Sequence, residues 1–402
     1  MKSRITEIAP LMPLVISLMT GIVMGRYVSL PFSWWYLLLG GVIITILLSR
    51  WAHLQSVAIV LCFVLLGAFM AERQSWETFR NSEIVQKDTT RLERSRAFFL
   101  HQRSLLLQRL VDGGVADEAY AVVAAMALGD KSALTKELKD TYSVTGASHV
   151  LALSGLHLGI IYMILSLLVV RRRWRMVSQL LVLISIWAFV FLVGMSVSVV
   201  RSAIMLSVYA LLSLGHRRKM SVNTLAFTAM VMLVANPRSL FDVGFQMSFM
   251  AVFSILIWMP ILGRVVKEDY LMDHKIVRWL WGLVTVSCAA QMGVAPLVAY
   301  YFGRFSSYFL LTNLIVIPAA TLILWLTLIV LMVPSLAYLL LYIVKGLNTI
   351  LSKMAAFPGA SIDGLHPTLL QLIMVYVIIF ALWELIRRTL PAEGWTPLRA
   401  RL

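Results

Sequence analysis

Long apolar runs, separated by short polar intervals, make up most of the chain. A helix needs roughly 20 consecutive apolar residues to cross the hydrocarbon core of a bilayer. We therefore predict an all-α polytopic membrane protein of about 12 helices, some of them half-crossings or broken helices. The predicted helices cover residues 9–27, 33–49, 54–71, 147–170, 176–194, 198–214, 221–235, 242–260, 278–300, 308–331, 336–356 and 368–386.

The longest polar interval, residues 72–140, divides the chain into predicted parts. Residues 1–71 form N-terminal membrane helices, and residues 141–390 form a second membrane region. Residues 391–402 form a short tail. The interval 72–140 is expected to be mostly helical and to lie outside the membrane.

Two local patterns add detail to these parts. Apolar residues interleaved with arginines after residue 90, among them Phe99 and Leu106, predict an amphipathic helix. This helix either lies on the membrane or is a solvated linker. Gly21 and Gly25, in the first predicted helix, form a GxxxG pattern suited to close helix contact.

Composition and charge support a membrane protein and predict its orientation. The chain is 60% hydrophobic with a mean hydropathy of +0.87 and a formal net charge of +16, which excludes an ordinary soluble domain. The positive-inside rule makes the side that carries the basic loops cytoplasmic. Both termini are then cytoplasmic, and the interval 72–140, with equally many basic and acidic residues, lies outside. The basic clusters are Lys2 with Arg4, residues 171–175, residues 216–219, and Arg387 with Arg388.

Polar side chains interrupt the apolar run over residues 147–170. If this run is one continuous helix with 100° per residue, His149, Ser154 and His157 share one face. Gly155 and Gly159 then lie on the opposite face as a second GxxxG pattern. We expect the glycine face to pack on a neighbouring helix and the polar face to point into the bundle or a wet cavity.

Several kinds of chemistry compete for this polar face. A zinc site would need further ligands, but the sequence has no HExxH motif and no accompanying Cys or Glu cluster. A hydrolase using Ser154 and His157 would need an aligned hydrogen bond, which neighbours on one helix rarely form. We therefore expect no metal, no cofactor and no catalytic residue. Periodicity leaves two readings open, a lined conduit and polar groups that lock helices together.

Other polar residues within the predicted helices fall from the outer third to mid-depth, which predicts one polar cavity opening to the outside. Each has a simpler alternative, such as snorkelling for Arg201 and helix capping for Asp242. The two are also predicted to form an ion pair. Phe249 belongs to a phenylalanine stripe that either packs in the core or stacks on bases. The candidates for lining a channel or contacting DNA are His149, Ser154, His157, Arg201, Asp242, Gln246, Phe249, Gln291 and Asn313.

The run Met126–Gly159, "MALGDKSALTKELKDTYSVTGASHVLALSGLHLG", resembles the signature of the ComEC competence family. The resemblance continues through "SVSVVRSAIM", "NPRSLFDVGFQMSFMAVFSIL" and "LTNLIVIPAA". It implies a channel in the bacterial inner membrane that passes single-stranded DNA into the cytoplasm during natural transformation. It also implies an extracytoplasmic DNA receptor and cytoplasmic motor or single-strand handling proteins as partners, besides membrane lipids.

The sequence departs from the family pattern in several places. Residues 75–118 are too short and too helical for the outer OB-fold that members often carry. The chain has no H-x-H-x-D-H metal motif and no G-x-x-x-x-G-K-[ST] motif, so a nuclease or ATPase would be a separate protein. A secondary transporter for a small polar or anionic solute is the alternative function, because broken helices also build such sites.

Overall fold

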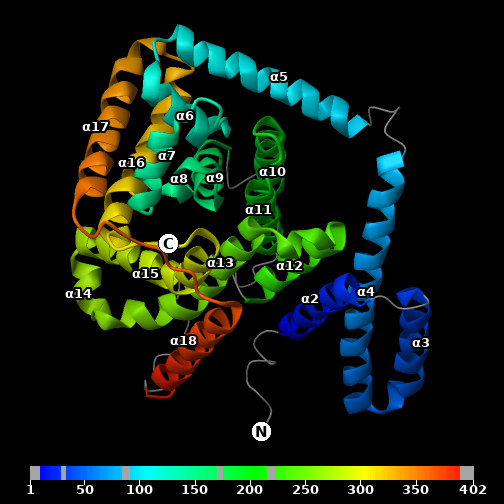
Figure 1. Ribbon diagram of the computed structural model, residues 1–402. Helices are drawn as coiled ribbons and strands as arrows, with labels where there is room; N and C mark the ends of the chain where they lie inside the picture. The colour runs from blue at the N-terminus through cyan, green and yellow to red at the C-terminus, as the bar shows by residue number, and fades with distance from the viewer. Residues whose placement is uncertain (1–9, 29–32, 84–90, 170–174, 215–221, 390–402) are drawn as a thin grey trace. The chain divides into compact units, whose positions relative to one another are not determined.

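The computed structural model describes residues 10–28, 33–83, 91–169, 175–214 and 222–389, which are helical apart from short connections and two three-residue strands (Figure 1). The predicted all-α class is confirmed. The tail 391–402 and most of the basic clusters, at residues 2–4, 171–174 and 216–219, lie outside the described residues.

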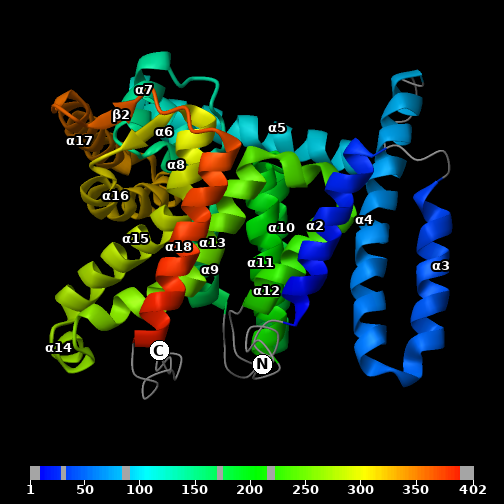
Figure 2. The ribbon, with the colours of Figure 1, turned by 60° about the horizontal axis from the view of Figure 1, so that its bottom comes forward.

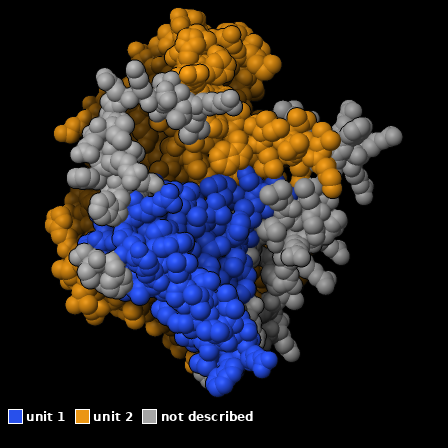
Figure 3. Space-filling model, turned by 90° about the vertical axis from the view of Figure 1, so that its right-hand side faces the viewer, with its two compact units in different colours: residues 1–90, 204–249 blue, residues 91–203, 250–402 orange. Residues whose placement is uncertain are grey.

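The chain divides into two compact units (Figure 3). Unit 1 holds residues 1–90 and 204–249, and unit 2 holds residues 91–203 and 250–402. These units do not follow the division expected from the polar interval, because residues from 141–390 contribute to both.

Unit 1 is built around a close crossing of two helices. Its elements are α2 (Leu11–Tyr27), α3 (Trp34–Leu47), η1 (Leu48–Arg50), α4 (Ala52–Glu83), α12 (Val222–Ala235), η3 (Pro237–Phe241) and parts of α11 (Val197–Leu214) and α13 (Val243–Leu262). A Cβ atom on Gly21 would overlap the backbone of Val64, and one on Gly25 would overlap the backbone of Ala68. Gly67 makes the reciprocal approach to Leu18. The close helix contact predicted from the GxxxG pattern is therefore present between α2 and α4.

Unit 2 contains the remaining elements: α5 (Arg91–Asp112), α6 (Asp117–Leu128), α7 (Lys136–Val144), α8 (Ser148–Leu151), α9 (Gly155–Val169), α10 (Arg175–Leu192), η4 (Gly263–Val265), α14 (Glu268–Asp273), α15 (Lys275–Phe302), β1 (Arg304–Ser306), α16 (Phe309–Val330), η5 (Pro334–Leu336), α17 (Ala337–Ala356), β2 (Ser361–Asp363) and α18 (Leu369–Thr389). The strands pair antiparallel, with Phe305 opposite Ile362.

The main apolar core of unit 2 surrounds α6. This helix is rich in alanine and valine and is buried on nearly all sides, as expected for a helix that is apolar all round. Gly129, at φ 72°, ends α6 in the left-handed conformation that glycine adopts without strain. Thr135 then caps α7 by accepting a hydrogen bond from Leu138 N at 3.2 Å. α16 and α17 pack against this core, which positions the segment containing α8 and α9.

Six helices among the described residues are long and apolar enough to cross a membrane. They are Ala52–Arg73, Val243–Val265, Lys275–Phe302, Phe309–Val330, Pro334–Ala356 and Leu369–Thr389. Six shorter apolar helices accompany them. The chain is thus a polytopic membrane protein.

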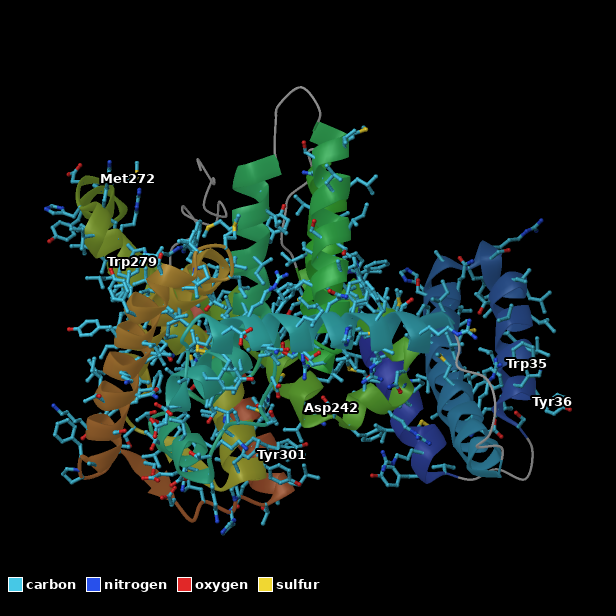
Figure 4. All side chains as sticks on the ribbon, turned by 90° about the horizontal axis from the view of Figure 1, so that it is seen from above. Trp35, Tyr36, Asp242, Met272, Trp279 and Tyr301 are labelled. Atoms are coloured by element: carbon cyan, nitrogen blue, oxygen red, sulfur yellow. The ribbon has the colours of Figure 1, made fainter. Side chains whose placement is uncertain are left out.

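α15 has the aromatic ends of a membrane-spanning helix. Trp279 near its start is 55% exposed and Tyr301 near its end is 38% exposed (Figure 4). At 1.5 Å per residue the two lie about 33 Å apart along the helix, close to the hydrocarbon thickness of a bilayer of about 30 Å. Aromatic side chains concentrate at the two membrane interfaces, so these residues fit the two belts.

Apolar helices run in more than one direction within unit 2. In Figure 2, α10 and α18 are seen along their length, whereas α16 and α17 are seen nearly end-on. The two pairs therefore lie crosswise to each other. If α10 and α18 cross the bilayer, α16 and α17 lie close to its plane, and fewer helices cross than the apolar runs suggest.

Candidate functional site

The apolar run 147–170 is not one continuous helix. α8 ends at Leu151, and Ala152 is extended at φ −92° and ψ 126°. α9 begins at Gly155, where Leu158 N donates to Ser154 O at 3.3 Å. The prediction of a single helix is wrong, and with it the assignment of faces by 100° steps from residue 148. The allowance for broken helices in this fold is confirmed here.

Ser154 and His157 bridge the start of α9. Ser154 N donates to His157 Nδ1 at 3.2 Å, and Ser154 Oγ lies 2.9 Å from the same nitrogen. The arrangement matches a capping box, S-x-x-E, with histidine in place of glutamate. Because Nδ1 accepts a backbone N–H, the neutral ring must carry its proton on Nε2. His157 is fully buried. Its hydrogen bonds to Ser154 cap the start of α9.

Ser154 Oγ and His157 Nδ1 are close enough for the hydrogen bond that a Ser–His pair needs. His157 Nδ1, however, also accepts the backbone N–H of Ser154. His157 Nε2 has no hydrogen-bond partner of good geometry among the described residues, so no carboxylate orients the ring there. A triad needs such an orienting group. The residues that the structure describes also contain no group of three His, Cys, Asp or Glu side chains that could bind a metal ion.

His149 lies on the other side of the break. Its Nδ1 is 3.0 Å from Gly146 O, so Nδ1 carries the proton and the neutral ring has a free lone pair on Nε2. Gly146 sits at φ +80°, and a Cβ there would meet Ser306 at 3.0 Å. Unlike His157, His149 is exposed. The break therefore presents one accessible imidazole and one buried imidazole.

The two glycines of α9 differ in their surroundings. A Cβ on Gly155 would lie 2.9 Å from Ser202 Oγ of α11, whereas a Cβ on Gly159 would meet nothing within 4 Å. Ser202 Oγ itself donates to Ser198 O at 2.9 Å. The close packing expected at this GxxxG pattern is found at Gly155, and Gly159 lies beside open space.

Arg201 is among the largest fully buried side chains, at 1% exposure. Its Nη2 donates to Ser198 Oγ at 3.1 Å, one turn earlier in α11. Snorkelling would leave the guanidinium at the protein surface, so burial does not fit that alternative. A buried guanidinium inside an apolar helix remains an expensive feature and hence a candidate functional group.

Asp242 caps α13, because its Oδ1 accepts a hydrogen bond from Phe245 N at 2.8 Å. The capping alternative for Asp242 is thereby confirmed. Gln246 supports the same helix start by donating from Nε2 to Leu240 O at 3.0 Å. Arg201 belongs to unit 2 and Asp242 to unit 1, so their ion pair stays a prediction.

The phenylalanines of α13 pack within the protein. The rings of Phe245 and Phe249 lie 4.3 Å apart between centroids, and the two residues are 2% and 8% exposed. A stacking platform for bases needs an accessible ring face. Phe249 therefore packs in the protein core.

Several polar groups near the start of α16 are buried without a hydrogen-bond partner among the described residues. They are Asn313 Oδ1, Thr312 Oγ1 and Ser306 Oγ. Buried polar atoms are nearly always satisfied in proteins, so three within eight residues mark a place where polar ligands or ions could bind. Asn313 was predicted from the sequence. Thr312 and Ser306 were not. Thr312 lies in α16, where a hydroxyl normally bonds to the preceding turn and gives no sequence signal, and Ser306 ends the short strand β1, which the sequence did not predict. Gln291 is half-buried on α15.

An open groove of about 800 Å³ lies on α7 and reaches α8 at Ser148. It is lined by Lys136, Glu137, Lys139, Asp140, Ser143 and Ser148. Asp140 accepts a hydrogen bond from Arg304 at 2.8 Å, and Asp363 pairs with the same guanidinium. The hydrogen bond to Asp140 raises the pKa of Arg304. The groove was not predicted, because its lining residues, although all within 136–148, carry no sequence signal for a hollow between them.

Comparison with known proteins identifies the region that carries these features. Residues 126–389 match the family described as Competence protein. ComE operon protein 3 of Bacillus subtilis (strain 168) is 31% identical over 209 residues, 51% of this chain and 25% of that protein. A protein of Aquifex aeolicus (strain VF5) is 30% identical over 201 residues, 50% of this chain and 45% of that protein. The matched region spans less than half of either relative, and no solved structure matches the chain. The family match includes α8, α9, Arg201 and α13, and the chain belongs to the competence protein family.

Proposed function

We propose that this protein takes part in DNA uptake by passing a single DNA strand across the bacterial plasma membrane, along a path that runs by the break between α8 and α9. The observation that carries the proposal is the broken apolar helix with His149, Ser154 and His157 at the break, inside the region matched by the competence family. Irregular backbone at membrane depth is tolerated where it is buried in protein or lines a cavity.

The chemistry of the region suits a polyanion. Arg201 is a buried guanidinium, and guanidinium groups match phosphate oxygens with two parallel hydrogen bonds. The unsatisfied oxygens at the start of α16 and the free lone pair of His149 add acceptors for base edges. The phosphate contacts do not depend on base sequence, as uptake of arbitrary DNA requires.

The protein is proposed to act as a conduit and not as an enzyme. Its partners would be an extracytoplasmic DNA receptor, a cytoplasmic motor or single-strand handling protein, and a separate nuclease if the second strand is degraded. We assign no nuclease or ATPase step to this sequence, because it contains neither an H-x-H-x-D-H nor a G-x-x-x-x-G-K-[ST] motif.

A secondary transporter is the second candidate function. The broken helix also supports it, because transporters place half-helix ends around a midplane site for a small solute. A strain lacking this protein separates the two. Loss of labelled DNA import, restored by re-expression, supports the conduit. Normal DNA import combined with lost uptake of a small labelled anion supports the transporter and contradicts our proposal.

We expect His157→Gln and His157→Ala to have different effects on stability. Glutamine at this position can accept the Ser154 N–H as in an ordinary capping box, whereas alanine leaves that donor unsatisfied and should cost about 1 kcal/mol. Protein abundance and thermal unfolding in detergent measure this difference. If the imidazole also serves strand passage, His157→Gln lowers DNA import at normal abundance. Equal loss of abundance in both variants would contradict the capping role.

The orientation of the chain in the membrane can be tested by cysteine labelling. We expect a cysteine at exposed Lys131, between α6 and α7, to be labelled by an impermeant reagent from outside in a variant without Cys62 and Cys288. A cysteine in the basic loop 171–174 should be labelled only after the membrane is opened, because basic loops stay in the cytoplasm. Labelling of the basic loop in intact cells would reverse the proposed topology.

A further inference from the structure

The helix α5 carries an outward stripe that the proposed conduit leaves unexplained. On a helical projection, six side chains fall within about 100° of one another. They are Arg94, Phe98, His101, Leu105, Gln108 and Arg109, and all six are exposed. We call this set the α5 stripe. Phe98 is 58% exposed, an unusual state for a phenylalanine in a folded unit.

The opposite face of α5 is already occupied by protein. Phe99 stacks on Phe191 at the end of α10, with ring centroids 5.5 Å apart. Leu107 and Leu110 are buried in the core of unit 2, and Arg103 lies 3.9 Å from Asp130. In Figure 2, α5 lies crosswise to α10 and α18. Because its apolar face packs against α10 and the core of unit 2, α5 turns its stripe outward.

The charge of the stripe has no internal counterpart. Neither Arg94 nor Arg109 forms an ion pair with any residue that the structure describes. The two arginines stand 15 residues apart, about 22 Å along the helix, with Phe98 and His101 between them. A strand with one phosphate per about 3.4 Å would present several phosphates over that length.

We infer that the α5 stripe binds single-stranded DNA on the outer side, with Arg94 and Arg109 contacting phosphates and Phe98 stacking on a base. The inference rests on the proposed passage of DNA. Basic side chains with interleaved aromatic rings are the recognition chemistry of proteins that bind single strands without sequence preference. An anionic lipid surface suits the stripe less well, because a membrane-bound helix buries its main apolar face in lipid, and that face of α5 is covered by α10 and the core.

Binding of a labelled oligothymidylate tests this inference. The full chain is placed in nanodiscs of zwitterionic phosphatidylcholine, and fluorescence anisotropy is followed over a range of salt concentrations. Phe98→Ala should weaken binding about 5- to 150-fold, the range for losing one base stack. The double change Arg94→Gln with Arg109→Gln should weaken binding and reduce the slope of log affinity against log salt by about 1.4, because each phosphate contact contributes about 0.7 for single strands.

Arg96→Gln is the matched control. Arg96 is exposed on the same helix and carries the same charge, but it lies about 200° from Arg94 on the projection. The Arg96→Gln variant should bind the oligonucleotide as the wild type does. Unchanged binding in the stripe variants, or an equal loss in Arg96→Gln, overturns the inference while leaving the conduit intact. If the stripe variants bind DNA normally but no longer gain thermal stability in nanodiscs with anionic lipid, the stripe contacts lipid and the inference is wrong. A wild-type protein that binds no oligonucleotide counts against the proposed function itself.

Discussion

Gly21→Ala is expected to remove most of the folded protein from the membrane. A Cβ atom at this position would overlap the carbonyl oxygen of Val64, so the backbones of α2 and α4 would have to move apart. Overpacking of a core typically costs about 1–3 kcal/mol, and a clash with backbone cannot be relieved by a rotamer change. We therefore expect a loss of roughly 3 kcal/mol or more in the free energy of unfolding, measured by denaturation in mixed micelles.

Gly40→Ala is the control for this experiment. Gly40 lies on α3 in the same unit, and a Cβ there would meet nothing within 4 Å. Alanine also has a higher helix propensity than glycine, so the Gly40→Ala variant should be as stable as the wild type or slightly more stable. If the two variants unfold alike, the close crossing of α2 and α4 does not hold unit 1 together.

Arg201→Lys is expected to lower DNA import roughly 10- to 100-fold. This magnitude corresponds to the loss of one hydrogen bond to a charged group, about 1.5–3 kcal/mol. Lysine keeps the positive charge but lacks the planar fork that grips two phosphate oxygens. The measurement is labelled DNA imported per amount of protein in the membrane, which separates a functional loss from a loss of folded protein.

Arg238→Lys supplies the comparison, because Arg238 is exposed in η3. It should import DNA at the wild-type rate. Should Arg201→Lys also import normally at normal abundance, Arg201 would be a packing residue of α11 and would not guide phosphates.

The positions of the membrane helices could be predicted from sequence because hydrophobic length is itself the physical requirement for crossing a bilayer. The same reasoning could not give helix direction. α16 and α17 have the apolar length of spanning helices, yet they run crosswise to α10 and α18 (Figures 1 and 2). Direction depends on packing against the core around α6, which involves residues far apart in the chain.

The break between α8 and α9 escaped prediction for a local reason. The residues at the break, Ala152 and Leu153, are good helix formers, so hydropathy and propensity continue through it. What starts α9 is the hydrogen bonding of Ser154 with His157, a capping box in which histidine replaces glutamate. Gly155 and Gly159 both lie in α9, and the GxxxG pattern gave them the same role, although only Gly155 approaches a neighbour closely.

The capping role of Asp242 was one of two readings that the sequence offered, and local geometry decided for it. In the same way, the apolar positions of α5 were identified correctly. The surface they meet, the ring of Phe191 in α10, could not be known before the fold. Amphipathic patterns show which face of a helix is buried, and they do not show whether protein or lipid buries it.

Crosslinking during DNA uptake tests the central claim most directly, namely that a strand passes by the break between α8 and α9. A photoreactive amino acid replaces exposed His149 at the break in one strain and Met163, 46% exposed on α9, in another. Cells importing labelled DNA are then illuminated. We predict that position 149 crosslinks to the label and position 163 does not. The absence of a crosslink at position 149 during active import, or equal crosslinking at both positions, would contradict the proposed path.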